Sequence, residues 1–106
     1  MIAEHMVRSR ATSPHAHTVH EVDFGRVEDF MDEKSGEYKE RGAKLTYTAF
    51  LLKAAAEALQ AFPLVNSVMA DEDEIIYRGD INIGMAVALE KSLIVPVIDN
   101  ADELSL

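Results

Sequence analysis

NIGMAVALEKSLIVPVID, residues 82–99, is the stretch that decides the fold, because it is almost wholly apolar apart from Glu90 and Lys91 near its centre. A membrane-spanning helix needs about 20 apolar residues without a central charge, and this stretch does not provide them. Glu90, Lys91 and Ser92 instead divide it into two short runs, 83–89 and 93–98, both rich in Val, Ile and Leu. This pattern predicts two strands joined by a tight turn.

Both runs are apolar on both of their faces, which predicts a strand pair that is covered on its two sides. Pro96 lies inside the second run and has no N–H to donate to a sheet ladder. We therefore expect an edge or an irregularity of the strand at this position.

The remaining elements follow from apolar periodicity and from residues that begin or end helices. Thr46 is a suitable N-cap, and the helix after it is so apolar that it should be mostly buried. The last residues, NADELSL, resemble the approach to another helix, with Asp102 or Ser105 as its cap. In full, the pattern predicts helices over 2–12, 27–41 and 47–62, a strand over 16–24, and a hairpin of 66–69 with 74–77.

Composition limits the class of protein. The chain has 106 residues, a formal net charge of −9 and no cysteine. It is long enough for one small domain. The negative charge argues against binding nucleic acid or an anionic membrane surface. The absence of cysteine, together with an N-terminus that lacks an apolar signal core, leads us to expect a cytoplasmic protein. The predicted mixture of helices and strands indicates the α/β (α+β) class.

His15, His17 and His20 form a cluster of metal-binding side chains in the pattern H-x-H-x-x-H. A zinc site needs three or four convergent ligands, and on a strand His20 would face away from the other two. Metal binding by these histidines is therefore the weakest of three alternatives for the function. No G-x-S-x-G, glycine-rich phosphate loop or calcium-loop spacing is present, so spacing alone reveals no active site.

The order of several segments resembles the catalytic domain of the dihydrolipoyl acyltransferases of 2-oxo acid dehydrogenase complexes. The segments are IAEHMVRS with the following SPH, EVD, KLTYTAFLLKA, FPLVN, and NIG leading into SLIVPVI. The resemblance runs from end to end. It implies a partial chloramphenicol acetyltransferase-like fold, in which helices flank a mixed sheet.

The resemblance also implies a reaction, namely acyl transfer from a dihydrolipoyl group to coenzyme A. In the family a histidine of an H-x-x-x-D-G motif acts as the base, and a Ser or Thr hydroxyl stabilises the oxyanion. Neither motif occurs in this chain, and HEVDFG at 20–25 has the wrong spacing. We therefore expect residues 1–106 to be the N-terminal half of the catalytic domain, with no catalytic residue of its own and no activity alone.

The implied coenzyme A contacts fall on three positions of this chain. Thr46 matches the family in kind, whereas Met31 replaces an arginine and Ala88 replaces an aspartate. The two departures favour a second alternative, a non-catalytic assembly module of the same fold. The implied partners are further copies of the chain in a trimer and a larger core, the lipoyl domain, and the dehydrogenase components. A half-domain should also expose apolar surface.

Overall fold

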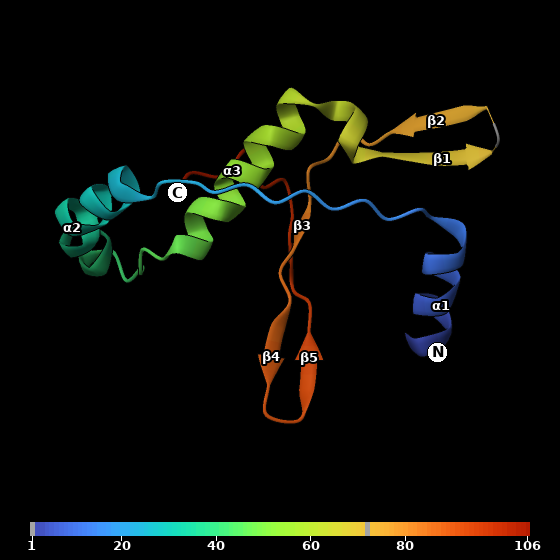
Figure 1. The fold of residues 1–106 in the computed structure, drawn as a ribbon. Coiled ribbons are helices and arrows are strands. Elements are labelled where there is room, and N and C mark those ends of the chain that lie inside the picture. The colour runs from blue at the N-terminus through green and yellow to red at the C-terminus, as the bar shows by residue number, and fades with distance from the viewer. Residues whose placement is uncertain (1, 72) are drawn as a thin grey trace.

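The computed structural model describes residues 2–71 and 73–106. Three α-helices, one 3₁₀ helix and six short strands follow one another along the chain (Figure 1). The helices are α1 (Ile2–Thr12), α2 (Gly25–Glu40), α3 (Tyr47–Ala61) and the 3₁₀ helix η1 (Pro63–Asn66). The strands are β1 (Ser67–Asp71), β2 (Glu74–Tyr77), β3 (Ile83–Gly84), β4 (Val87–Leu89), β5 (Ser92–Ile94) and β6 (Val97–Ile98).

Helix α3 begins and ends where the sequence predicts. Thr46 is its N-cap in an extended conformation, and the Thr46 hydroxyl oxygen accepts a hydrogen bond from the Ala49 N–H at 3.3 Å. Pro63 ends the helix because a proline restricts the residue before it and fits the first position of the following 3₁₀ turn. Both predicted boundary signals are confirmed.

Helix α2 begins two residues earlier than predicted. The Asp23 carboxylate accepts a hydrogen bond of 2.8 Å from the Gly25 N–H, which satisfies one of the free donors at the helix start. At the other end, Gly42 adopts a φ of +77°, in the left-handed region that favours glycine. Gly42 therefore acts as the stop of this helix.

Two glycines of this region should respond to alanine in opposite directions. Gly42→Ala places a Cβ in the left-handed region and should lower the free energy of unfolding by about 1 kcal/mol. Gly36→Ala lies inside α2, where a Cβ would meet no atom within 4 Å, and should raise it by about 0.5–1 kcal/mol. Thermal unfolding of the two variants checks the pair, and shifts of the same sign would contradict it.

The stretch 82–99 folds back on itself as predicted. β4 pairs antiparallel with β5 across a turn at Glu90 and Lys91, and β3 pairs antiparallel with β6 nearer the body. Pro96 interrupts the second run between β5 and β6, where its carbonyl oxygen accepts a 3.0 Å hydrogen bond from the Met85 N–H. The expected irregularity at Pro96 is confirmed. β1 and β2 form the predicted hairpin, with a register shift between Met69 and Asp71.

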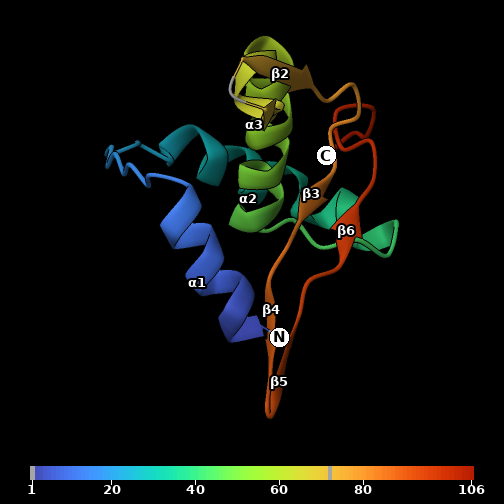
Figure 2. The same cartoon turned by 90° about the vertical axis from the view of Figure 1, so that its right-hand side faces the viewer.

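The fold class is confirmed, in the form of helices combined with small sheets. Each of the three sheets found in residues 2–71 and 73–106 has two strands and is antiparallel. Figure 2 shows β4 and β5 extending as a narrow arm away from α2 and α3.

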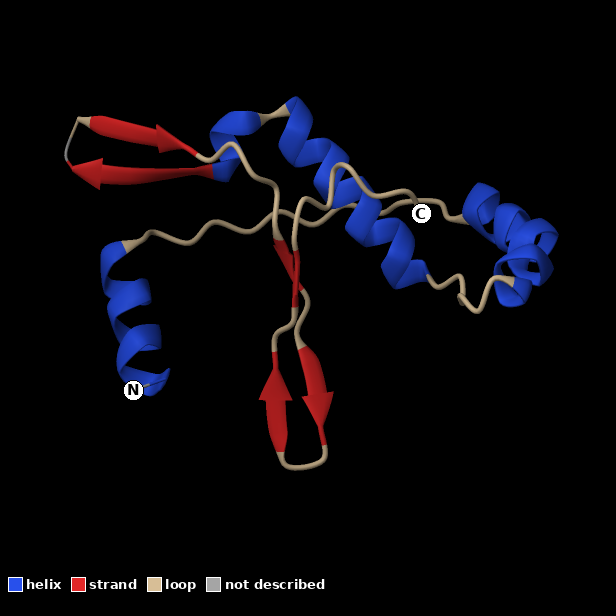
Figure 3. Cartoon of the chain, turned by 180° about the vertical axis from the view of Figure 1, so that it is seen from behind, coloured by secondary structure: helices blue, strands red, loops and turns tan. Residues whose placement is uncertain are grey.

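The predicted burial of the strands and of α3 is wrong. Leu93 of β5 is 64% exposed, and Ala56 is the only fully enclosed residue of α3. In the part of the chain that the structure describes, no further layer packs against the faces of the hairpin (Figure 3). Apolar patterning predicts which faces need a cover, but the cover has to come from another element.

The predicted strand over 16–24 is also wrong. Residues 14–24 have no regular structure and link α1 to α2 across the molecule (Figure 1). A strand needs a ladder partner to satisfy its backbone, and this segment has none among the described residues. Val19, at its middle, is 94% exposed.

The core is small and lies where α3 meets the base of the hairpin. Ala56, Ile81 and Ala101 form a buried cluster, and three half-buried side chains pack around it, namely Leu59, Ile83 and Ile98. The Ala101 N–H donates a 2.8 Å hydrogen bond to the Ile81 carbonyl, which fixes the C-terminal turn against the start of β3.

The chain is far from compact. Its radius of gyration is 17.3 Å, whereas a compact domain of this length has about 13 Å. Its accessible surface is 9568 Å², against about 5,900 Å² for a compact monomer of its mass. Much of the apolar surface of this chain is therefore left uncovered by the chain itself.

Candidate functional site

Thr46 lies at the start of α3, in the connection from α2. Its hydroxyl oxygen is the N-cap acceptor, yet a hydroxyl also carries one O–H donor. The residue is half-buried, so this donor can reach a ligand at the helix start. Capping and ligand binding are thus compatible at Thr46, as the sequence predicts.

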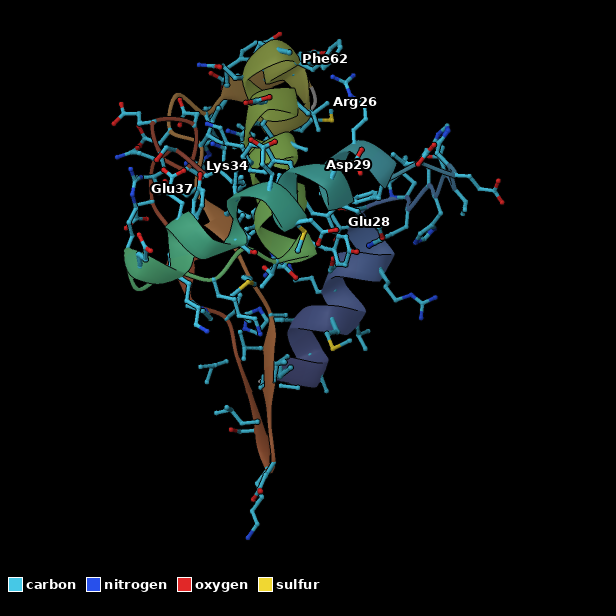
Figure 4. The ribbon with its side chains drawn as sticks, turned by 90° about the vertical axis from the view of Figure 1, so that its left-hand side faces the viewer. Arg26, Glu28, Asp29, Lys34, Glu37 and Phe62 are labelled. Atoms are coloured by element: carbon cyan, nitrogen blue, oxygen red, sulfur yellow. The ribbon has the colours of Figure 1, made fainter. Side chains whose placement is uncertain are left out.

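The junction of α2 and α3 is held by side chains that sequence reasoning missed. The Tyr47 hydroxyl donates a 2.8 Å hydrogen bond to the Glu28 carboxylate. The Tyr47 ring also packs edge-to-face against Phe24, with 5.7 Å between ring centroids. Phe50, one turn further along α3, packs edge-to-face against Phe30 with 5.8 Å between ring centroids. Figure 4 shows Glu28 and Asp29 near the first turns of α2, with Lys34 and Glu37 further along.

Tyr47 titrates unusually late because of this contact. The hydrogen bond to Glu28 raises the pKa of the Tyr47 phenol, and partial burial and the negative charges of Glu28 and Asp32 raise it further. A phenolate beside two carboxylates is disfavoured, so the neutral donor form persists.

The other two predicted coenzyme A positions, Met31 and Ala88, lie in different parts of the structure. Met31 is half-buried on α2, three residues after Glu28, and so lies on the same face of this helix as Glu28. Ala88 lies on β4, paired with Leu93, and in both Figure 1 and Figure 2 this strand extends away from α2 and α3. The structure therefore does not bring Ala88 to Thr46 within one chain.

The histidines lie near α1 rather than on a strand. The His15 ring Nδ1 is 2.7 Å from the Ser13 carbonyl oxygen, to which it donates. A cavity of about 650 Å³ separates α1 from the following segment and is lined by Ile2, His5, Met6, Ser9, Arg10, His15 and His17. His20 is not part of it. In residues 2–71 and 73–106, no three His, Cys, Asp or Glu side chains are placed to hold a metal ion.

Lys53 anchors the C-terminal segment to α3. Its ammonium donates to the Leu104 carbonyl at 2.7 Å and to the Asp102 carbonyl at 3.4 Å, and Glu57 lies 4.0 Å away on the same helix. The sequence alone does not predict this contact, since the two carbonyl partners are about 50 residues away.

Lys53→Met should release this segment. Loss of hydrogen bonds from a charged donor should lower the free energy of unfolding by about 1–2 kcal/mol. Hydrogen exchange of the Ala101 and Glu103 amides should accelerate at the same time, because the Ala101 N–H donates to the Ile81 carbonyl, the Glu103 N–H donates to the Asn100 carbonyl, and both amides belong to the anchored segment. Lys44→Met, at an exposed lysine, is the matched control. Unchanged exchange in Lys53→Met would show that the anchor is not needed.

Within the described residues, no helix is both long enough and apolar enough to cross a membrane.

Comparison with known proteins gives one consistent result over the whole chain. A family model described as the catalytic domain of 2-oxoacid dehydrogenases acyltransferase matches residues 1–106. The lipoamide acyltransferase component of the branched-chain alpha-keto acid dehydrogenase complex of Bacillus subtilis is 46% identical over 106 residues. This alignment covers 99% of the present chain and 25% of that protein.

Solved structures agree with the family match. A probable dihydrolipoamide acetyltransferase from Listeria monocytogenes superimposes with a TM-score of 0.89 at 45% identity, covering 98% of this chain and 44% of that one. The cubic core of a pyruvate dehydrogenase multienzyme complex superimposes with a TM-score of 0.91 at 35% identity, covering 98% and 43%. The chain thus spans about a quarter of the length of the curated relatives it matches and less than half of these structures.

Proposed function

The chain belongs to the family of 2-oxoacid dehydrogenase acyltransferase catalytic domains, and on this premise we propose that residues 1–106 serve as the N-terminal half of one such domain. The observation that carries the proposal is the match of the family over all 106 residues, combined with coverage of less than half of each similar structure. The predicted resemblance to this family is confirmed.

The proposed reaction is the transfer of an acyl group from a dihydrolipoyl group to coenzyme A. The coenzyme A sulfur forms a bond to the acyl carbon, the bond from that carbon to the dihydrolipoyl sulfur breaks, and the released thiol takes the proton. A base and an oxyanion donor are needed for these steps. Residues 1–106 contain no H-x-x-x-D-G motif, so both groups would come from elsewhere in the domain.

We assign the coenzyme A contact of this half to Thr46. Its O–H remains free to donate while its oxygen caps α3, and the residue lies in the connection between two helices. Met31 and Ala88 cannot supply the charges that the family has at their positions. Binding in this half would therefore depend on Thr46 and on how α2 is placed against α3.

The same proposal includes assembly with further copies into a trimer and a larger core, and the exposed surface of the chain supports it. The chain exposes about 3,700 Å² more surface than a compact monomer of its mass, whereas a standard interface takes about 800 Å² from each partner. Burial against the rest of the domain and against neighbouring copies would cover this excess. Lipoyl domains and dehydrogenase components are the further proposed partners, in the cytoplasm.

Activity measurements on two forms of the protein test the proposal. The 106-residue chain alone should give no acyl-coenzyme A from an acyl-dihydrolipoamide donor. The same residues continuous with a complete catalytic domain should give the thioester, detected by mass spectrometry. Turnover by the 106-residue chain alone would overturn the half-domain proposal, and inactivity of an assembled, complete domain would overturn the enzymatic one.

A non-catalytic assembly module is the second candidate, favoured by the uncharged side chains of Met31 and Ala88. Calorimetric titration of the assembled protein with coenzyme A separates the two candidates. Heat of binding that disappears in Thr46→Val supports the acyltransferase. An intact assembly that binds no coenzyme A supports the module.

A further inference from the structure

Helix α2 is attached to the rest of the molecule by very few groups. None of its 16 residues is buried, so it has no core face of its own. Its first turns nevertheless lie against the start of α3 through the Glu28–Tyr47 hydrogen bond and the two edge-to-face aromatic pairs. These contacts, together called the α2–α3 clamp below, join two elements that residues 41–46 connect in the sequence.

The polar contact of the clamp lies next to the proposed ligand position on each helix. Tyr47 follows Thr46 directly, and Glu28 precedes Met31 by three residues, which places the two on neighbouring turns of the same helical face. Tyr47 is 46% exposed and Glu28 is exposed, so the hydrogen bond contributes little burial. The 2.8 Å hydrogen bond from the phenol to the carboxylate is directional, so its main effect is to fix the orientation of one helix relative to the other.

We infer that Glu28 and Tyr47 are positioning residues, whose hydrogen bond sets α2 against α3 and so shapes the coenzyme A side of the site around Thr46. This inference rests on the proposed function. Neither residue needs to touch the ligand. Met31 stands where the family has an arginine, so α2 has no positive charge to offer coenzyme A at this position. In this inference α2 contributes to the coenzyme A site through its placement against α3.

The pair also fixes the position of one negative charge of α2. Coenzyme A carries phosphates, and the acids of α2 outnumber its bases. Two bases near the other end of the helix are already paired with the Glu37 carboxylate. Lys34 of α2 is 3.6 Å from it, and Arg41, the residue just after α2, is 3.3 Å from it. The Tyr47 O–H donates a hydrogen bond to the Glu28 carboxylate and so holds this negative charge against the start of α3.

The test uses the assembled protein with its complete catalytic domain and three variants. Tyr47→Phe removes only the hydroxyl and keeps the ring against Phe24, and Glu28→Gln keeps the shape and removes the charge. Tyr77→Phe, on exposed β2, is the matched control. We expect the KM for coenzyme A to rise about tenfold in Tyr47→Phe and less in Glu28→Gln, with kcat and the KM for the dihydrolipoyl donor within about twofold of wild type.

A spectroscopic titration reports on the same contact independently of activity. One of the three tyrosines should ionise late in the wild type and near its usual pKa of about 10 in Glu28→Gln. Because the contact raises the pKa of the folded Tyr47 phenol above its usual value, the hydrogen bond is complete below pH 10 and is lost only as the pH rises through the raised folded pKa. Three normal titrations in the wild type would overturn the contact.

The outcomes distinguish this inference from the proposed function. A wild-type protein that neither binds nor turns over coenzyme A refutes the proposed function and the inference together, before any variant is made. An active wild type whose KM for coenzyme A is unchanged in Tyr47→Phe overturns the inference alone. A rise in both KM values, or a fall in kcat with loss of assembly, would show a general structural role and would also overturn it.

Discussion

Ile81→Ala should lower the free energy of unfolding by about 2–5 kcal/mol, one of the two largest effects that we expect from this structure. Ile81 is 6% exposed and lies between Ala56, which is 0% exposed, and Ala101. The other two buried members of the cluster are alanines, whose short side chains cannot move in to fill the space of the lost atoms, and the larger side chains around them are only half-buried. The cavity should therefore persist, and its cost adds to that of the lost apolar burial.

The effect is large relative to what this chain can spare. Small domains have total stabilities of about 5–15 kcal/mol, and here the buried cluster of the described residues has three members. Chemical denaturation of the protein measures the change. Ile2→Ala, at an isoleucine that is 80% exposed on α1, is the matched control and should change the stability by less than about 0.5 kcal/mol. Equal effects of the two variants would show that the cluster is not the core.

Signals that act within a few residues predicted the fold well. Thr46 begins α3 because its hydroxyl satisfies a backbone donor three residues on, and Gly42 follows α2 because its φ is positive. Pro96 interrupts a strand because it has no N–H. Each of these causes is contained in the local sequence and needs no distant partner.

Features that depend on distant partners could not be predicted in this way. Residues 16–24 have the composition of a strand, but no neighbouring strand is available to them among the residues that the structure describes. The runs 83–89 and 93–98 pair as expected, yet their apolar faces stay exposed because covering them requires another element. Patterning reveals the need for burial and not where the burial occurs.

The candidate site shows the same division. Thr46 was found through its capping position and through the resemblance of KLTYTAFLLKA to the family, both of which are readable along the chain. The partner of Tyr47 was not found, because Glu28 lies 19 residues earlier and is one of many acids in α2. An acid beside an aromatic becomes informative only when the structure brings the two together.

The 106-residue chain prepared by itself should associate and bind an apolar dye, which is the second large effect. The isolated chain exposes 9568 Å² of surface, well above the roughly 5,900 Å² of a compact monomer of its mass. Large apolar side chains are exposed along the β4–β5 hairpin, namely Leu89, Leu93, Ile94, Val95 and Val97. An exposed apolar hairpin with free edges is a template for pairing with other copies.

Sedimentation velocity and dye fluorescence over a concentration series measure this association. Replacing Leu89 and Leu93 with lysine should shift the distribution toward smaller species, since charge on the hairpin opposes edge pairing without touching the Ala56–Ile81–Ala101 cluster. Circular dichroism of the same samples shows whether the helices are retained in the variant. A wild-type chain that sediments as one monomer and leaves the dye dark would mean that the apolar faces are covered within the chain. That result would contradict both the exposed hairpin and the half-domain proposal, because a self-sufficient fold needs no second half to bury its strands.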